Sequence, residues 1–263
     1  LAFGSPEGMP GSSEVVADTR ELGVELAALA PAPSSVWGEQ TFVGTDTEAD
    51  VRVVVIGRDA TDAHLMSKLF RFVWFKDSGP HLALSRTQQI QHRAYVLLLA
   101  ERAGVTSATV LAAGPAGRKG DAVLVLRSSP GRTLDTVPAE QLDDHVLATA
   151  WAELAALHEL GVSHQSIGLD ALTLADDGRV GFVDLATADT SPSHEALLAD
   201  RASLLVTIAV LASEERAVAS AATALGTEGL AEVLPLLQAP ALPRALRRGA
   251  PDVRHLSDRL RSA

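Results

Sequence analysis

The stretches LHELGVSHQS at residues 157–166 and FVDLA at residues 182–186 decide the fold of this chain. In the first stretch a helical pattern ends before a glycine, and a short strand then leads to a loop that begins at His164. In the second stretch, about twenty residues later, another short strand ends in Asp184. This order predicts a loop and a strand end that both present polar side chains.

The composition indicates a folded, acidic chain without cysteine. Its 263 residues are 47% hydrophobic, which is enough for two modest lobes with a buried core. The absence of cysteine excludes disulfides and thiolate metal sites, and it fits a reducing compartment. The net charge of -11 argues against a nucleic-acid binder, which needs a basic face. No stretch reaches the roughly 18 apolar residues that span a bilayer, and the start of the chain lacks the charged and apolar regions of a signal peptide.

Strand patterns gather early in the chain and helix patterns gather late. We expect strands at 36–44, 51–56, 108–113 and 122–126, two short strands around 176–178, and helices at 14–29, 60–75, 85–103, 140–160, 197–213, 214–225, 229–237 and after 251. The chain breaks at the turn sequence of residues 128–131. This segregation predicts an α+β fold with two lobes. Residues 1–35 are expected to form a partly flexible extension, residues 36–127 a small β-rich lobe, and residues 128–263 a larger helical lobe.

Over residues 36–211 these patterns resemble the protein-kinase-like superfamily. Residues 128–132 resemble its hinge, and residues 140–160 resemble the long helix before its catalytic loop. His164 then stands where the family has the His of His-Arg-Asp, and Asp184 stands where it has the Asp of Asp-Phe-Gly. Asp200, near the start of an apolar helix, matches the buried Asp that braces the catalytic loop in such folds. The resemblance implies a bilobal kinase-like fold, with His164, Asp184 and Asp200 as structural remnants.

The resemblance also implies that the catalytic set is degenerate. The four altered positions are Val54 for the strand lysine, Arg93 for the helix glutamate, Ser166 for the catalytic aspartate and Ala171 for the asparagine. A serine hydroxyl cannot accept a proton at neutral pH as a carboxylate can. The acidic turn at residues 45–50, taken as the tip of the first hairpin, would repel ATP. We therefore expect a catalytically inactive pseudokinase domain that binds or regulates and needs no cofactor.

Asp184 keeps an alternative open, namely an atypical small-molecule kinase or a nucleotide-binding domain that uses ATP with magnesium. In that alternative Asp184 and Asp170 would hold the metal, and Arg127, Ser128 and Asp184 would contact the nucleotide. Otherwise Asp184 is a carboxylate that fixes its loop by accepting backbone hydrogen bonds. A third possibility is a plain interaction scaffold, because a fold does not imply a function.

Residues 37–44, 56–60 and 74–80 resemble the kinase-like cytoplasmic region of bacterial multi-pass membrane proteins of the lysylphosphatidylglycerol synthase/flippase-like kind. This resemblance implies a cytoplasmic domain that is tethered to the membrane in a full-length protein. Its partner would be another protein or the membrane part of its own chain. The expected contact surfaces are Phe72 and Phe75, and a group of C-terminal arginines: Arg244, Arg247, Arg248, Arg254, Arg259 and Arg261.

Overall fold

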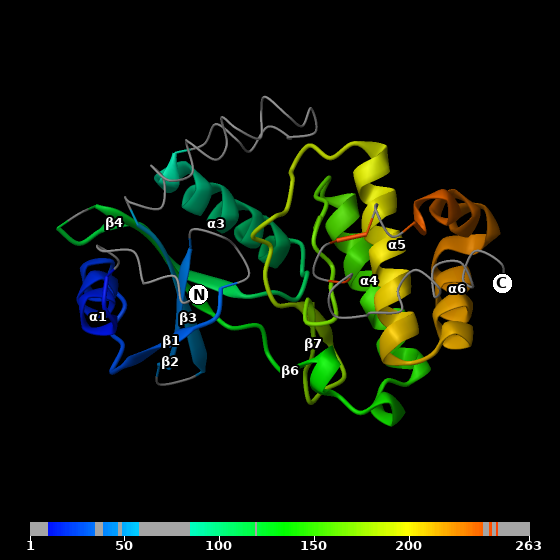
Figure 1. Cartoon of the computed structure of the whole chain (residues 1–263), viewed down its shortest axis with the longest axis horizontal. Coiled ribbons are helices and arrows are strands. Elements are labelled where there is room, and N and C mark those ends of the chain that lie inside the picture. The colour runs from blue at the N-terminus through cyan, green and yellow to red at the C-terminus, as the bar shows by residue number, and fades with distance from the viewer. Residues whose placement is uncertain are drawn as a thin grey trace, which may run out of the picture. The chain divides into compact units, whose positions relative to one another are not determined.

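The computed structural model describes residues 10–34, 39–46, 49–57, 85–118, 120–238, 242–243 and 246. Within these residues an antiparallel sheet occupies the N-terminal part and helices dominate the C-terminal part (Figure 1). The expected α+β class is therefore confirmed, and this division is consistent with the expected two-lobed, kinase-like fold. The chain divides into two compact units, residues 1–95 with 109–128 (the N-terminal unit) and residues 96–108 with 129–263 (the C-terminal unit).

A five-stranded antiparallel sheet forms the frame of the N-terminal unit. Its strands run in the order β1-β2-β3-β5-β4, with bounds β1 Leu29–Ala32, β2 Gln40–Thr45, β3 Asp50–Ile56, β4 Thr109–Ala116 and β5 Asp121–Arg127. The expected hairpins β2–β3 and β4–β5 are both present. Strands β3 and β5 occupy the centre of the sheet and are buried on both faces, which explains their continuous apolar sequences.

The first strand corrects our expectation of a helix over residues 14–29. Helix α1 covers Ser12–Glu21 and so ends eight residues before the expected end. Strand β1 follows as an edge strand paired with β2. Gly23 adopts a φ of +85, a left-handed conformation that commonly ends helices. Pro31 is unsuited to a helix interior but is tolerated on a sheet edge. A hairpin β1–β2 therefore precedes the expected hairpin β2–β3, whose two strands are connected by the acidic turn at residues 45–50.

Helix α1 covers one face of this sheet. Val15 of α1 is fully buried in a cluster with Phe42 of β2, Val53 of β3 and Val125 of β5. These three strand residues lie directly opposite one another in the register, so their side chains share a face. Residues that we expected in a flexible extension thus contribute to the core of the unit.

Helix α3, Arg86–Arg102, matches the helix expected over residues 85–103. Ser85 and Gln88 form a reciprocal cap at its start, because Gln88 N–H donates to Ser85 Oγ at 3.2 Å and Ser85 N–H donates to Gln88 Oε1 at 2.8 Å. The turn that follows the helix is fixed within the C-terminal unit, where Thr106 N–H donates to the carboxylate of Glu153 at 2.9 Å.

Between residues 129 and 238, the described part of the C-terminal unit combines three longer helices with a small three-stranded sheet. The helices are α4 Asp144–Glu159, α5 His194–Leu211 and α6 Glu214–Val233, and the strands are β6 Arg132–Thr133, β7 Leu172–Leu174 and β8 Val180–Phe182. Three short 3-10 turns, Leu134–Thr136, Ala139–Gln141 and Leu234–Leu236, complete it. We expected separate helices at 214–225 and 229–237, and the observed helix is indeed interrupted at Gly226, where φ is +70.

Several expectations lie outside the described residues. These are the helices at 60–75 and after 251, the aromatic contacts Phe72 and Phe75, and the C-terminal arginines. Among the helices that the structure does describe, none combines the length and the apolar character needed to cross a membrane.

Replacing Phe42 tests the strand register that directs its side chain toward the face of the sheet covered by α1. Phe42→Ala should lower the free energy of unfolding by about 3–5 kcal/mol, because the large side chain leaves a cavity in the α1-covered core. Val43→Ala is the matched control, since Val43 is the next residue and is 40% exposed. Chemical denaturation of the two variants measures the difference, and equal losses would show that the register is wrong.

Candidate functional site

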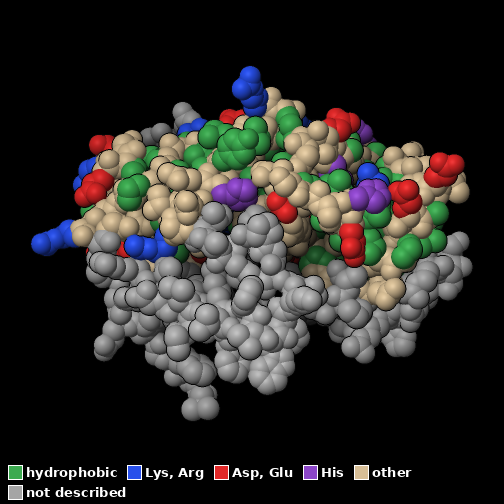
Figure 2. Space-filling view, turned by 90° about the horizontal axis from the view of Figure 1, so that it is seen from above, with side chains coloured by type: hydrophobic (Ala, Val, Ile, Leu, Met, Phe, Trp, Pro, Cys, Tyr) green, Lys and Arg blue, Asp and Glu red, His purple; other side chains and the backbone are tan. Residues whose placement is uncertain are grey.

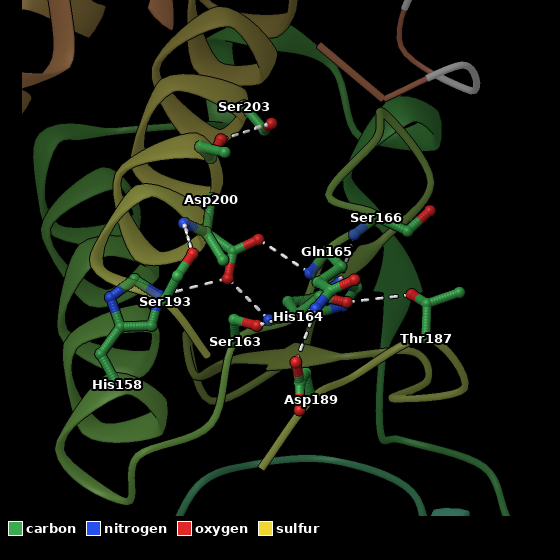
Figure 3. Close-up of polar contacts among 12 residues, drawn as sticks. His158, Ser163, His164, Gln165, Ser166, Thr187, Asp189, Ser193, Asp200 and Ser203 are labelled. Carbon is green, nitrogen blue, oxygen red and sulfur yellow. Dashed lines mark hydrogen bonds and ion pairs between the residues drawn. The ribbon is translucent and has the colours of Figure 1, made fainter. Parts of the chain in front are cut away.

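A buried carboxylate holds the loop that begins at His164. Asp200 lies in the second turn of α5 and is 2% exposed. Its Oδ2 accepts a hydrogen bond from His164 N–H at 2.6 Å, and its Oδ1 accepts one from Gln165 N–H at 2.8 Å (Figure 3). Both backbone donors are therefore bound to one charged acceptor, an arrangement stronger than a pair of neutral hydrogen bonds. The loop is shaped by this contact.

His158, at the end of α4, also contacts Asp200. Its Nε2 lies 3.2 Å from Asp200 Oδ2, and its side chain is 7% exposed. Figure 3 shows the imidazole and the loop on different sides of the carboxylate. Asp200 thus connects α4, α5 and the loop at one point. These contacts fix the position of the start of the loop.

His164 lies in the interior of the C-terminal unit and packs on Phe182 of β8, with the ring centroids 5.1 Å apart. Its Nδ1 accepts a hydrogen bond from Ser166 N–H at 3.3 Å. Burial lowers the pKa of His164, and this effect exceeds the opposing influence of the Asp200 and Asp184 carboxylates. A neutral imidazole that accepts from the backbone and packs on an aromatic ring supports the loop structurally.

The segment after Asp184 is attached directly to the loop. Ser163 and Asp189 exchange two backbone hydrogen bonds, of 3.0 and 2.9 Å, and Thr187 Oγ1 donates to His164 C=O at 2.9 Å. Gln165 adopts a φ of +63, uncommon for a residue other than glycine. Its side-chain amide reaches Ser163 Oγ at 3.3 Å and Asp189 Oδ2 at 3.4 Å. The segment is therefore held by backbone and side-chain hydrogen bonds to the loop.

The residues that we considered for catalysis or metal binding lie in different environments. Ser166 is half-buried, and Figure 3 shows its side chain pointing away from Asp200. Asp170 is exposed in a turn, and Ala171 is buried and binds Gly168 and Val183 through its backbone. Asp184 is half-buried just after β8. Among the described residues, no group of three or more His, Cys, Asp or Glu side chains is arranged to hold a metal ion.

In the N-terminal unit, the expected lysine and glutamate positions hold Val54 and Arg93. Val54 is fully buried, opposite Thr41 of β2 and Leu124 of β5. Arg93 of α3 forms an ion pair with Glu39, with 3.1 Å between Nη1 and Oε2. Sequence reasoning missed this partner, because Glu39 lies 54 residues earlier in the chain.

Arg127 and Ser128, which we expected to contact a nucleotide if one binds, contact other parts of the N-terminal unit. Arg127, the last residue of β5, forms an ion pair with Asp46 in the β2–β3 turn, at 3.2 Å. Ser128 N–H donates to Asp50 C=O at 2.8 Å. Asp46 also accepts from Ala49 N–H at 2.8 Å and so stabilises its own turn. These contacts give both residues a role in joining the turn to the end of β5.

Comparisons with known proteins indicate only a distant likeness. No family model and no curated protein matches the sequence. Among solved structures, a co-crystal structure of WbdD with the kinase inhibitor LY294002 gives a TM-score of 0.44 at 17% identity, over 72% of this chain and 39% of that chain. Monomeric WbdD gives 0.40 at 19% identity, over 66% and 36% respectively. This chain spans less than half of the length of either structure, and a likeness this distant carries no information about its activity.

Removing the Asp200 carboxylate should destabilise the C-terminal unit. Asp200→Ala leaves the N–H groups of His164 and Gln165 without their acceptor, so we expect a loss of about 3–5 kcal/mol in the free energy of unfolding. Ser203→Ala is the control, because Ser203 lies on the same helix and its hydroxyl donates to Ala199 C=O within that helix. Denaturant unfolding compares them, and a loss no larger than that of Ser203→Ala would contradict the bracing role.

The pH dependence of the free energy of unfolding should reveal the lowered pKa of His164. In the unfolded chain this side chain titrates near pH 6.5, whereas burial lowers its pKa in the folded protein. Below about pH 6.5 the unfolded state therefore binds a proton that the folded state does not, and stability falls as the pH falls, by up to about 1.4 kcal/mol per unit. His164→Phe should remove this slope, whereas His145→Gln, at an exposed position, should retain it. Unfolding curves between pH 5 and pH 7 measure both, and an unchanged slope in His164→Phe would refute the assignment.

Proposed function

We propose that this chain is a non-catalytic, pseudokinase-type domain that acts by binding. The observation that carries the proposal is the state of the loop at residues 164–166. Its backbone is braced by Asp200 and its histidine is buried, while the side chain at its end is the hydroxyl of Ser166. The loop thus has a braced backbone and, at position 166, no carboxylate that could accept a proton, which supports a non-catalytic role.

The N-terminal unit supports the same proposal. The position of the nucleotide-binding lysine is taken by Val54, which is fully buried in the strand at the centre of the sheet. A lysine introduced there would have to enter an apolar environment, and such lysines lose their charge readily. Arg93 already has a carboxylate partner in Glu39. A single substitution in either unit is therefore not expected to create activity.

We propose that the partner of the domain is a protein, either a separate one or the membrane part of a longer chain to which this domain belongs. The support is the resemblance of residues 37–44, 56–60 and 74–80 to cytoplasmic regions of bacterial membrane proteins. The acidic net charge of -11 disfavours nucleic acid. On the face seen in Figure 2, the acidic and basic side chains of the described residues are interspersed rather than gathered in a basic patch.

A phosphotransfer assay with radiolabelled ATP and magnesium or manganese tests the proposal. We expect no transfer by the wild-type chain, by Asp184→Ala or by Ser166→Asp, because the missing groups are distributed over both units. Transfer by the wild-type chain that is lost in Asp184→Ala would overturn the proposal. It would favour the alternative, a small-molecule kinase that uses Asp184, and this alternative also predicts thermal stabilisation by millimolar ATP with the metal.

A further inference from the structure

Asp18 places a carboxylate between helix α1 and the turn that joins β4 to β5. It lies in the last turn of α1 and is 4% exposed. Among the described residues, its side chain forms no hydrogen bond and no ion pair. An ionised carboxylate loses hydration on burial, so an unpaired one is costly to bury. The contact that holds α1 therefore contains an unfavourable group.

Gly117, the first residue after β4, lies directly against this carboxylate. A Cβ atom added to Gly117 would lie only 2.5 Å from Asp18 Oδ1. The φ of Gly117 is +70, which also favours glycine. Gly117 N–H donates to Glu21 Oε2 at 2.9 Å. The end of α1 is thus attached to the turn by Glu21, while Asp18 packs against the same glycine without a hydrogen bond.

The charged groups around Asp18 are mostly acidic. Glu14 lies four residues before it and Glu21 three residues after it, so both share its face of α1. Asp121, the first residue of β5, is 3% exposed, and its Oδ1 lies 3.6 Å from Nη1 of Arg86 at the start of α3. The cation that reaches this place therefore pairs with a different carboxylate.

Burial raises the pKa of the Asp18 carboxyl, and repulsion by the three neighbouring acids raises it further. Arg20 and Arg118 are exposed and form no ion pair with Asp18, and Lys119 lies outside the described residues. The folded chain thus binds this proton more readily than the unfolded chain does. The resulting stability is fully present below the ordinary pKa of an aspartate and is lost as the pH rises through the raised pKa.

We propose that Asp18 makes the docking of α1 on the sheet proton-dependent, so that the helix is held tightly when this carboxyl is protonated and is loosened when it ionises. Protonation removes the repulsion within the acidic group and needs no opening for a ligand. This device goes beyond the proposed function, because it involves neither the loop at residues 164–166 nor a bound partner.

Asp18→Asn tests the proposal, because it removes the charge and keeps the shape of the side chain. At pH 7 the variant should melt about 2 °C or more above the wild-type chain, and the difference should shrink as the pH falls to 5. Glu25→Gln is the matched control, since it removes the charge of an exposed acid just after α1. Each variant is compared with the wild-type chain at the same pH, so the separate effect of His164 cancels.

Amide hydrogen exchange of residues 15–22 measures the docking of α1 in the wild-type chain itself. The protection factors, corrected for the intrinsic exchange rate, should rise by up to about tenfold per pH unit between pH 7 and pH 5. In Asp18→Asn they should change little over the same range, because no proton is taken up at this position.

The inference is overturned if Asp18→Asn fails to fold or gains no more stability at pH 7 than Glu25→Gln. Equal protection of α1 in the wild-type chain at pH 5 and pH 7 would contradict it as well. These measurements are independent of the phosphotransfer assay, so activity in the wild-type chain would overturn the proposed function alone.

Discussion

A carboxylate buried in an apolar helix has to find donors, and Asp200 finds them in the backbone of His164 and Gln165, with His158 on its other side. These contacts fix the end of α4, the start of α5 and the loop relative to one another. The segment after Asp184 is then hydrogen-bonded to the same loop through Ser163 and Thr187. The shape of the region thus depends on the buried carboxylate of Asp200.

The contacts that brace this loop do not depend on its side chains. The bracing contacts use backbone N–H groups, so they are indifferent to which side chain stands at position 166. In the N-terminal unit, Arg93 of α3 forms an ion pair with Glu39, which immediately precedes β2. Contacts within each unit thus stabilise the loop and the start of β2.

Much of this could be predicted from the sequence. The apolar periodicity of α4 and the β-branched run of β3 indicated their structures, and Asp200 stood out as a charge at the start of an apolar helix. Strand β1 was missed because its sequence, LAPA, has little strand propensity and is stabilised by pairing with β2. The Glu39–Arg93 pair was missed because nothing local indicates a contact between residues 54 positions apart.

We propose that the loop at residues 164–166 is preformed and that its structure is independent of nucleotide. Amide hydrogen exchange of His164 and Gln165, measured with and without millimolar ATP and magnesium, tests it most directly. The account predicts slow exchange in the free protein and no change on adding nucleotide, because Asp200 already binds both N–H groups. Rapid exchange in the free protein that becomes slow only with ATP and magnesium would contradict it.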